Sequence, residues 1–163
     1  MEPVFNTCID SPIGLIQITS NENEVLAVEF VSECIPDSEI IPKVLCVCKN
    51  ELEHYFSGQL KSFSVKLFPE GTDFQKDVWN ELIKIPYGET TTYINIAKQL
   101  KNEKAVRAVG SANGKNNLAI IIPCHRVIGE NGKLTGYAGG LNRKQWLLEH
   151  ERNFSNKKAN LLF

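Results

Sequence analysis

The sequence predicts an α+β/α two-part protein: a small α/β N-terminal domain with antiparallel strands (residues 1–70), a mainly helical C-terminal domain (71–153) and a C-terminal tail (154–163). Two observations carry this prediction. Apolar residues alternate along residues 13–31 as they do in strands, and they recur at helical spacing from Phe74 onward. A length of 163 residues is enough for one domain, or two small ones, with a buried core.

The N-terminal domain is expected to contain a β-hairpin and a helix. Two apolar strands, at residues 15–18 and 25–30, flank a polar turn. Residues 44–56 carry apolar side chains at helical spacing, and Gly58 follows as a helix terminator. Residues 62–67 are expected to form a further strand. None of these elements carries residues of catalytic character.

The C-terminal domain is expected to begin with a helix that is capped by Thr72 or Asp73 and ended by Pro86. The predicted inward face of this helix comprises Phe74, Val78, Leu82 and Ile85. A second short helix is predicted over residues 93–100, after threonine caps at 90–92. Its predicted inward residues are Ile94, Ala97 and Leu100.

A polar turn at residues 101–104 leads to a third helical segment at 105–113. Two short helices joined in this way fit either a helix-turn-helix or an ordinary helical hairpin. The third segment is dominated by small residues between Arg107 and Gly114. Because glycine in a helix costs about 1 kcal/mol relative to alanine, something is expected to approach this helix closely. A DNA backbone and a neighbouring helix fit equally well.

The composition excludes several classes of protein. No apolar run approaches the roughly 20 residues of a membrane helix, and the N-terminus has no secretory-signal pattern, so a soluble cytoplasmic protein (nuclear in a eukaryote) is expected. The net charge of −1 conceals an asymmetry between the two halves of the chain. Residues 1–85 contain 6 basic and 14 acidic side chains, whereas residues 86–163 contain 12 basic and 5 acidic side chains. The basic half suggests a polyanionic partner such as nucleic acid.

The chain contains five cysteines, namely Cys8, Cys34, Cys46, Cys48 and Cys124. Because the number is odd and no export signal is present, a disulfide framework is not expected. Cys46 and Cys48, with His54 nearby, fit either a metal site or a helix core. The helical spacing of their apolar neighbours favours the core, and a metal site would need distant Cys8 or Cys34.

Cys124 is the residue whose surroundings indicate chemistry. The apolar run at residues 118–122 is expected to be a buried strand, and Pro123 is expected to end it in a defined turn. His125 and Arg126 follow Cys124, and neighbouring cations lower the pKa of a thiol and favour the thiolate. A nucleophile and a buried structural cysteine both fit this pattern.

A histidine base needs an orienting group. A helix is predicted over residues 142–151, with Trp146 and Leu147 on its packed face. Glu151 at the end of this helix is the carboxylate that we expect to orient His125.

The region around Cys124 resembles the O6-alkylguanine-DNA alkyltransferases, also called methylated-DNA–protein-cysteine methyltransferases. The resemblance extends over about half of the chain with its spacing kept. The matching residues are Tyr87-Gly88-Glu89, Thr92-Tyr93, Arg107-Ala108-Val109-Gly110, Asn116, Pro123-Cys124-His125-Arg126-Val127, Gly136-Tyr137, Gly139-Gly140-Leu141, Trp146-Leu147-Leu148 and Glu151. The N-terminal half resembles the family only in its general plan.

The resemblance implies DNA repair by irreversible transfer of an alkyl group, such as methyl, from O6-alkylguanine in DNA, with O4-alkylthymine as a further candidate substrate. The implied catalytic roles are Cys124 as acceptor, His125 as base through a water, Glu151 as its orienting carboxylate, Tyr93 as proton donor to the leaving guanine, and Asn116 as a hinge. The thioether product is stable, so each molecule acts once as a suicide enzyme. No cofactor and no metal are implied.

The resemblance also implies a helix-turn-helix that binds double-stranded DNA through the minor groove, with the alkylated base flipped out. Arg107 would enter the vacated space. The expected DNA-binding residues are Arg107, Tyr93, Gly110, Ser111, Ala112, Asn113, Gly114 and Arg126, and the expected pocket residues are Tyr137, Ala138 and Gly139. The chain is expected to act as a monomer, without a membrane partner.

Two other functions fit parts of the sequence. A non-catalytic protein that binds alkylated DNA would use the same surface, but such proteins replace the acceptor cysteine that Cys124 supplies here. A Cys–His thiol hydrolase would leave the basic half and the small-residue helix unexplained. Two positions depart from the family pattern: Asn117 stands where many relatives carry proline, and Ala138 where relatives often carry a hydroxyl group.

Overall fold

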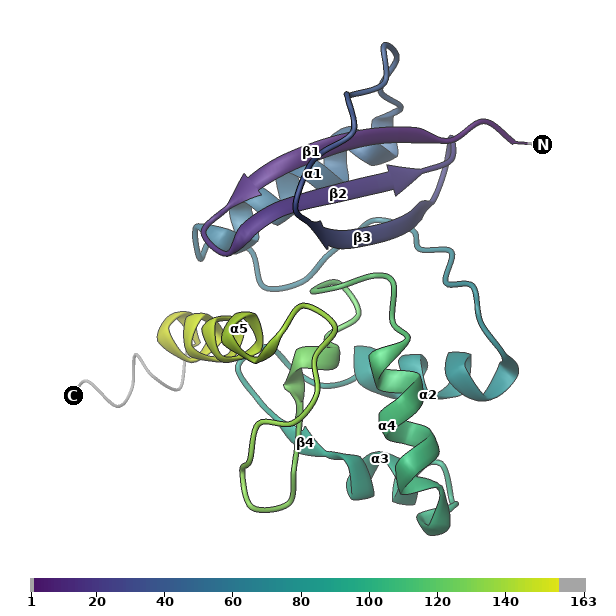
Figure 1. Ribbon diagram of the computed structural model, residues 1–163, viewed down its shortest axis with the longest axis vertical. Coiled ribbons are helices and arrows are strands. Elements are labelled where there is room, and N and C mark those ends of the chain that lie inside the picture. Colours follow the sequence, from purple (N-terminus) through teal and green to yellow (C-terminus); the bar gives the residue numbers. More distant parts are fainter. Residues whose placement is uncertain (1, 156–163) are drawn as a thin grey trace. The chain divides into compact units, whose positions relative to one another are not determined.

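The fold is taken from a computed structural model, which describes residues 2–155. The chain divides into two compact units. The first runs through Glu70 and includes Asn117–Ile121, and the second contains Gly71–Asn116 and the described residues from Ile122 onward. The antiparallel strands lie in the first unit and most helices lie in the second, as the sequence predicts (Figure 1).

The first unit is a three-stranded antiparallel sheet with one helix against it. Strands β1 (Phe5–Ser11), β2 (Gly14–Ser20) and β3 (Val25–Val31) lie in that order, and helix α1 (Lys43–Phe56) covers one face (Figure 1). The predicted hairpin and helix are confirmed, but the prediction lacked β1. Only one of the two buried residues of β1, Ile9, is apolar, so the apolar period of a strand is weak there.

The core of this unit is apolar and includes one of the cysteines. Its buried apolar residues on the sheet and on α1 are Ile9, Ile16, Ile18, Val25, Val28, Leu45, Cys48, Leu52 and Tyr55. Burial raises the pKa of Cys48 to about 12, whereas Cys46 is exposed. Within residues 2–155 no three His, Cys, Asp or Glu side chains are placed to hold a metal ion. Cys48 therefore acts as a small apolar core residue.

Two predicted strands are wrong. Of residues 62–67 only Leu67 meets the sheet, through one parallel bridge to β3. Of residues 118–122 only Leu118 does so, again through one bridge to β3. Ile120 then adopts a φ of 72°, a left-handed conformation that turns the chain and prevents further pairing. A run of apolar residues indicates that a segment is buried, but a strand also needs a neighbouring strand with which it can form backbone hydrogen bonds along its length.

The second unit is built mainly of helices. Its elements are α2 (Asp73–Ile83), β4 (Thr91–Thr92), α3 (Tyr93–Gln99), a 3₁₀ turn (Glu103–Ala105), α4 (Val106–Gly114), a second 3₁₀ turn (Cys124–Arg126), β5 (Val127–Ile128) and α5 (Leu141–Phe154). Helices α3 and α4 form the predicted helix-turn-helix (Figure 1). The parallel pair β4–β5 was not foreseen, because each strand is only two residues long.

Side-chain caps begin two of these helices, as predicted. The Gln75 N–H donates to Thr72 Oγ1 (3.1 Å) and the Thr72 N–H donates to Gln75 Oε1 (2.9 Å), which is a complete capping box for α2. The helix ends before Pro86. The Asn95 N–H donates to Thr92 Oγ1 (3.2 Å) and caps α3.

Two details of the helix prediction need correction. Helix α3 buries Ile96, which the prediction omitted, whereas Ile94 and Leu100 stay partly exposed. Helix α5 continues to Phe154, the first residue of the predicted tail, and Ser155 is its C-cap; residues 156–163 of the predicted tail lie outside the described residues. No helix in the described part of the chain is long and apolar enough to cross a membrane.

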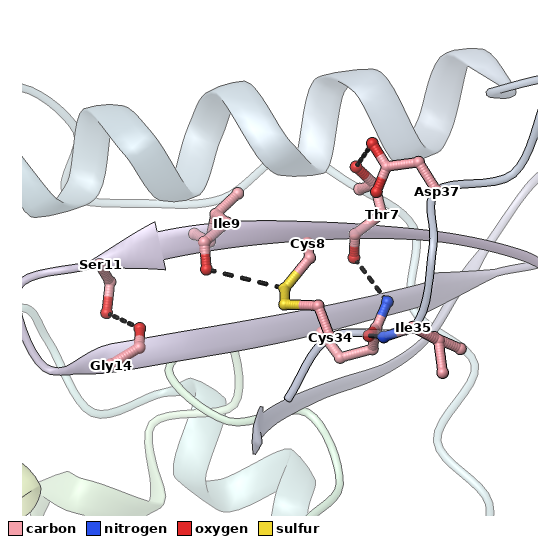
Figure 2. The surroundings of a disulfide bond; sticks show 9 residues. Thr7, Cys8, Ile9, Ser11, Gly14, Cys34, Ile35 and Asp37 are labelled. Carbon is pink, nitrogen blue, oxygen red and sulfur yellow. Dashed lines mark hydrogen bonds between the residues drawn. A yellow bond between two sulfur atoms is a disulfide. The ribbon is translucent and has the colours of Figure 1, made fainter. Parts of the chain in front are cut away.

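A disulfide joins Cys8 of β1 to Cys34, which follows β3 (Figure 2). The expectation that the chain forms no disulfide is therefore wrong. An odd cysteine count says nothing about distance, and the chain beyond β3 returns to β1 so that the two Cα atoms lie 6.1 Å apart. The Thr7 hydroxyl donates to Asp37 Oδ2 (3.1 Å) and holds the same loop against β1 (Figure 2).

Removal of this disulfide is expected to lower the free energy of unfolding by about 3 kcal/mol, because the bond restricts the unfolded chain. Urea unfolding without reductant compares the wild type with the Cys8→Ser/Cys34→Ser variant. Cys46→Ser, at an exposed free cysteine, is the control and should unfold like the wild type. Alkylation of the denatured, unreduced protein should modify three cysteines, and modification of all five would contradict the bond.

Candidate active site

Cys124 lies at the start of a tight 3₁₀ turn that follows Pro123, as the proline predicted. The Cys124 N–H donates to the Ile122 carbonyl (2.8 Å), and the Arg126 N–H donates to the Pro123 carbonyl (3.0 Å). The Cys124 residue is 4% exposed. The turn thus holds the thiol in a dry and fixed position.

Burial raises the pKa of the Cys124 thiol above its ordinary value. A hydrogen bond from Asn116 and the positive charge of Lys144 oppose this rise without reversing it. The expected thiolate, favoured by adjacent cations, is therefore wrong for the resting protein. The guanidinium of Arg126 is paired elsewhere, and the thiol keeps its proton until a base removes it.

His125 and Glu151 are in contact inside the protein. His125 Nε2 lies 2.7 Å from Glu151 Oε2, and both side chains are almost fully buried. Burial lowers the pKa of His125 although the Glu151 charge opposes this, so the imidazole is neutral. A neutral ring that donates from Nε2 keeps its lone pair on Nδ1, and Nδ1 has no hydrogen-bond partner among the described residues. Nδ1 is thus the available base.

Arg126 completes the environment of Glu151. Its Nε donates to Oε1 (2.7 Å) and its Nη2 to Oε2 (2.9 Å), while Nη1 donates to the Ile85 carbonyl (2.8 Å). Burial alone would raise the pKa of Glu151, but His125 and Arg126 hold it well below its usual range. The predicted DNA contact of Arg126 is revised, because this buried guanidinium is already engaged by protein acceptors.

The end of α4 is tied to the turn at Cys124. The Asn116 amide donates to the Ile122 carbonyl (2.8 Å), and the Asn113 amide donates to the Cys124 carbonyl (3.3 Å). Trp79 Nε1 of α2 donates to the carbonyl of Ala112 (2.8 Å). Ala112 and Asn113 are buried, so neither belongs to the outer surface on which DNA contacts were expected.

The outer face of α4 carries small and basic residues. Its exposed residues, with the lysine that follows the helix, are Arg107, Ala108, Ser111, Gly114 and Lys115. A Cβ at Gly114 would meet nothing within 4 Å, and one at Gly110 would meet only Tyr93 Cδ1 at 3.9 Å. Packing within the unit does not require either glycine. This face of α4 therefore has no side chain beyond a hydrogen atom at its glycines, and a partner molecule can approach the helix backbone closely there.

A cavity of about 500 Å³ opens beside this helix. Its lining comprises Tyr93, Val106, Gly110, Asn113, Gly114, Thr135, Gly136, Tyr137 and Ala138. The Tyr93 hydroxyl donates to the Thr135 carbonyl (3.3 Å) and accepts from Thr135 Oγ1 (3.2 Å). Gly139, predicted for the pocket, is not among the lining residues; its carbonyl accepts from Arg143 (3.0 Å). The volume suits a ligand of the size of a nucleobase.

Sequence reasoning missed Lys144. This fully buried residue of α5 donates from Nζ to the carbonyls of Val127 (2.6 Å), Thr135 (2.7 Å) and Gly136 (3.3 Å). Burial lowers its pKa to about 8. The sequence did contain a signal for this residue: Lys144 and Glu151 are two helical turns apart, which places both side chains on the same face of α5. Lys144 thus ties the cavity wall at Thr135 and Gly136 to helix α5.

Removal of the Arg126 charge is expected to destabilise the protein strongly. Arg126→Met leaves a buried carboxylate underpaired, so the free energy of unfolding should fall by about 3–5 kcal/mol. Urea unfolding measures the change. Lys84→Met, which breaks the exposed Lys84–Glu81 pair (2.9 Å), is the matched control and should cost about 1 kcal/mol or less. Equal effects of the two substitutions would refute the importance of the buried pair.

Acidification is expected to lower the free energy of unfolding in two stages. The pKa of folded His125 lies below 6.5, so the unfolded chain binds that proton more readily as pH falls below 6.5. The pKa of folded Glu151 lies below 4.5, so a second loss begins below 4.5. Urea unfolding above, between and below these two values tests the prediction. Glu151→Gln should lose less stability below 4.5 than the wild type, and an equal loss would contradict it.

Comparison with known proteins identifies related sequences for both units. The model of the 6-O-methylguanine DNA methyltransferase DNA binding domain matches residues 73–153, and that of its ribonuclease-like domain matches residues 4–69. A methylated-DNA–protein-cysteine methyltransferase of Methanosarcina acetivorans is 52% identical over 153 residues, which cover 91% of this chain and 98% of the relative.

Solved structures agree over nearly the whole chain. The crystal structure of Mycobacterium tuberculosis O6-methylguanine methyltransferase has a TM-score of 0.85 at 42% identity, covering 99% of this chain and 100% of that chain. A crystal structure of the mycobacterial protein in complex with DNA has a TM-score of 0.82 at 43% identity, covering 96% and 98%. This chain therefore belongs to the 6-O-methylguanine DNA methyltransferase family.

Proposed function

We propose that this protein repairs DNA by transferring the alkyl group of O6-alkylguanine irreversibly to Cys124. The observation that carries the proposal is the buried thiol followed directly by a neutral histidine, His125, which Glu151 holds through Nε2. A neutral thiol beside a neutral base suits a displacement in which the proton leaves as the sulfur attacks. Family membership and the named relatives support the same reaction.

The proposed step is an in-line displacement at the alkyl carbon. Nδ1 of His125 takes the thiol proton, directly or through one water, while Cys124 Sγ forms a bond to carbon and the carbon–O6 bond breaks. The guanine leaves with the electron pair, and the Tyr93 hydroxyl at the cavity wall supplies a proton to its ring nitrogen. This proton stabilises charge that develops only in the transition state. Asn116 positions the turn that carries the thiol.

The proposed substrate is double-stranded DNA with the alkylated base rotated out of the stack into the cavity. Arg107, exposed near the start of α4, would fill the vacated space, and Gly110, Ser111 and Gly114 would lie against the minor groove. The structure of a relative in complex with DNA supports this partner. We place the protein, as a monomer, in the compartment that holds the DNA: the cytoplasm, or the nucleus in a eukaryote.

Incubation with a duplex oligonucleotide that contains one O6-methylguanine is expected to increase the intact mass by roughly 14 Da at Cys124, saturating at one methyl per molecule. Cys124→Ser should bind the duplex without any gain in mass. Cys46→Ser, at an exposed cysteine, should react like the wild type. Lesion binding without transfer by the wild type would indicate a sensor instead. Turnover of an ester substrate would indicate a hydrolase.

A further inference from the structure

Asn113 has a buried acceptor that the reaction described above does not use. Its side-chain nitrogen donates to the Cys124 carbonyl (3.3 Å), and the residue is only 4% exposed. Its Oδ1 has no hydrogen-bond partner among the described residues. Buried polar atoms are nearly always satisfied, so an exception in a ligand cavity indicates a group that the ligand supplies.

The orientation of this amide is set by its neighbour. With the amide reversed, its oxygen would face the carbonyl oxygen of Cys124, and two acceptors repel. The acceptor role of Oδ1 therefore follows from the chain itself. Among the other lining residues, Val106 and Ala138 have no polar side-chain atoms, and the side chains of Tyr93 and Thr135 are hydrogen-bonded to each other.

We propose that Asn113 is a specificity-determining residue, whose Oδ1 accepts a hydrogen bond from the exocyclic 2-amino group of the flipped O6-alkylguanine. The inference rests on the proposed function. Alkylation at O6 leaves N1 without a proton, so the 2-amino group is the remaining N–H donor of the base. O4-alkylthymine has no N–H donor at all. An acceptor beside the turn that carries the thiol thus selects the purine lesion over the pyrimidine lesion.

The test compares single-turnover rate constants on three duplexes, which contain O6-methylguanine, O6-methylhypoxanthine or O4-methylthymine. O6-methylhypoxanthine differs from O6-methylguanine only by the missing 2-amino group. The wild type should react about tenfold faster with the guanine lesion than with the hypoxanthine lesion, because the latter leaves Oδ1 unpaired. In Asn113→Leu, which keeps the size and removes the acceptor, the ratio should fall to about one.

A purely structural effect of the substitution would change both rate constants equally and leave their ratio intact. Val106→Ala, in the same cavity, is the matched control: it should slow both lesions alike and preserve the ratio. Asn113→Met provides a second variant of similar size in case Asn113→Leu does not fold. In Asn113→Met the ratio of the rate constants for the guanine and hypoxanthine lesions should also fall to about one.

The inference alone is overturned by a wild-type ratio near one, or by a ratio that persists in both Asn113 variants. A higher rate of the wild type on O4-methylthymine than on O6-methylguanine would also contradict it. Failure of the wild type to transfer methyl from any of the three duplexes would instead refute the proposed function, and the inference with it.

Discussion

The buried carboxylate of Glu151 is the interaction on which the active-site unit depends. It accepts hydrogen bonds from His125 and from two nitrogens of Arg126, and the Gly88 N–H also approaches it (3.3 Å). These partners come from the 3₁₀ turn that begins at Cys124 and from the loop after α2. A buried carboxylate is stable only when charged or hydrogen-bonding partners surround it. Because Glu151 requires these partners, it fixes the positions of the segments that carry them.

The charges of the site are arranged so that the reacting groups themselves are neutral. The Glu151 charge is balanced by Arg126, while burial keeps both the Cys124 thiol and the His125 imidazole uncharged. A thiol held in this state resists oxidation and unspecific alkylation, because the thiolate is the reactive form. In the reaction proposed above, proton transfer and attack would occur together once a substrate fills the cavity. For a protein that acts once, this protects the single acceptor.

Local patterns in the sequence were sufficient for much of the fold. The hairpin, helix α1, the caps at Thr72 and Thr92 and the turn after Pro123 all follow from spacing and from residue chemistry within a few positions. Strand β1, the β4–β5 pair and the Cys8–Cys34 bond did not, because each depends on a partner that is distant in sequence. The wrong strand before Cys124 has the same origin: its apolar residues are buried, but they lack a partner to pair with.

The sequence by itself predicted the residues of the proposed reaction, namely Cys124, its neighbour His125 and Glu151, through residue type, order and family resemblance. Only the tertiary structure decided the protonation state and the hydrogen-bond partners of these residues. It turned Arg126 from an expected DNA contact into the partner of Glu151, and it buried Lys144 beneath the cavity wall. Charge and pKa depend on burial and on distances between segments far apart in the chain, and a linear pattern contains neither.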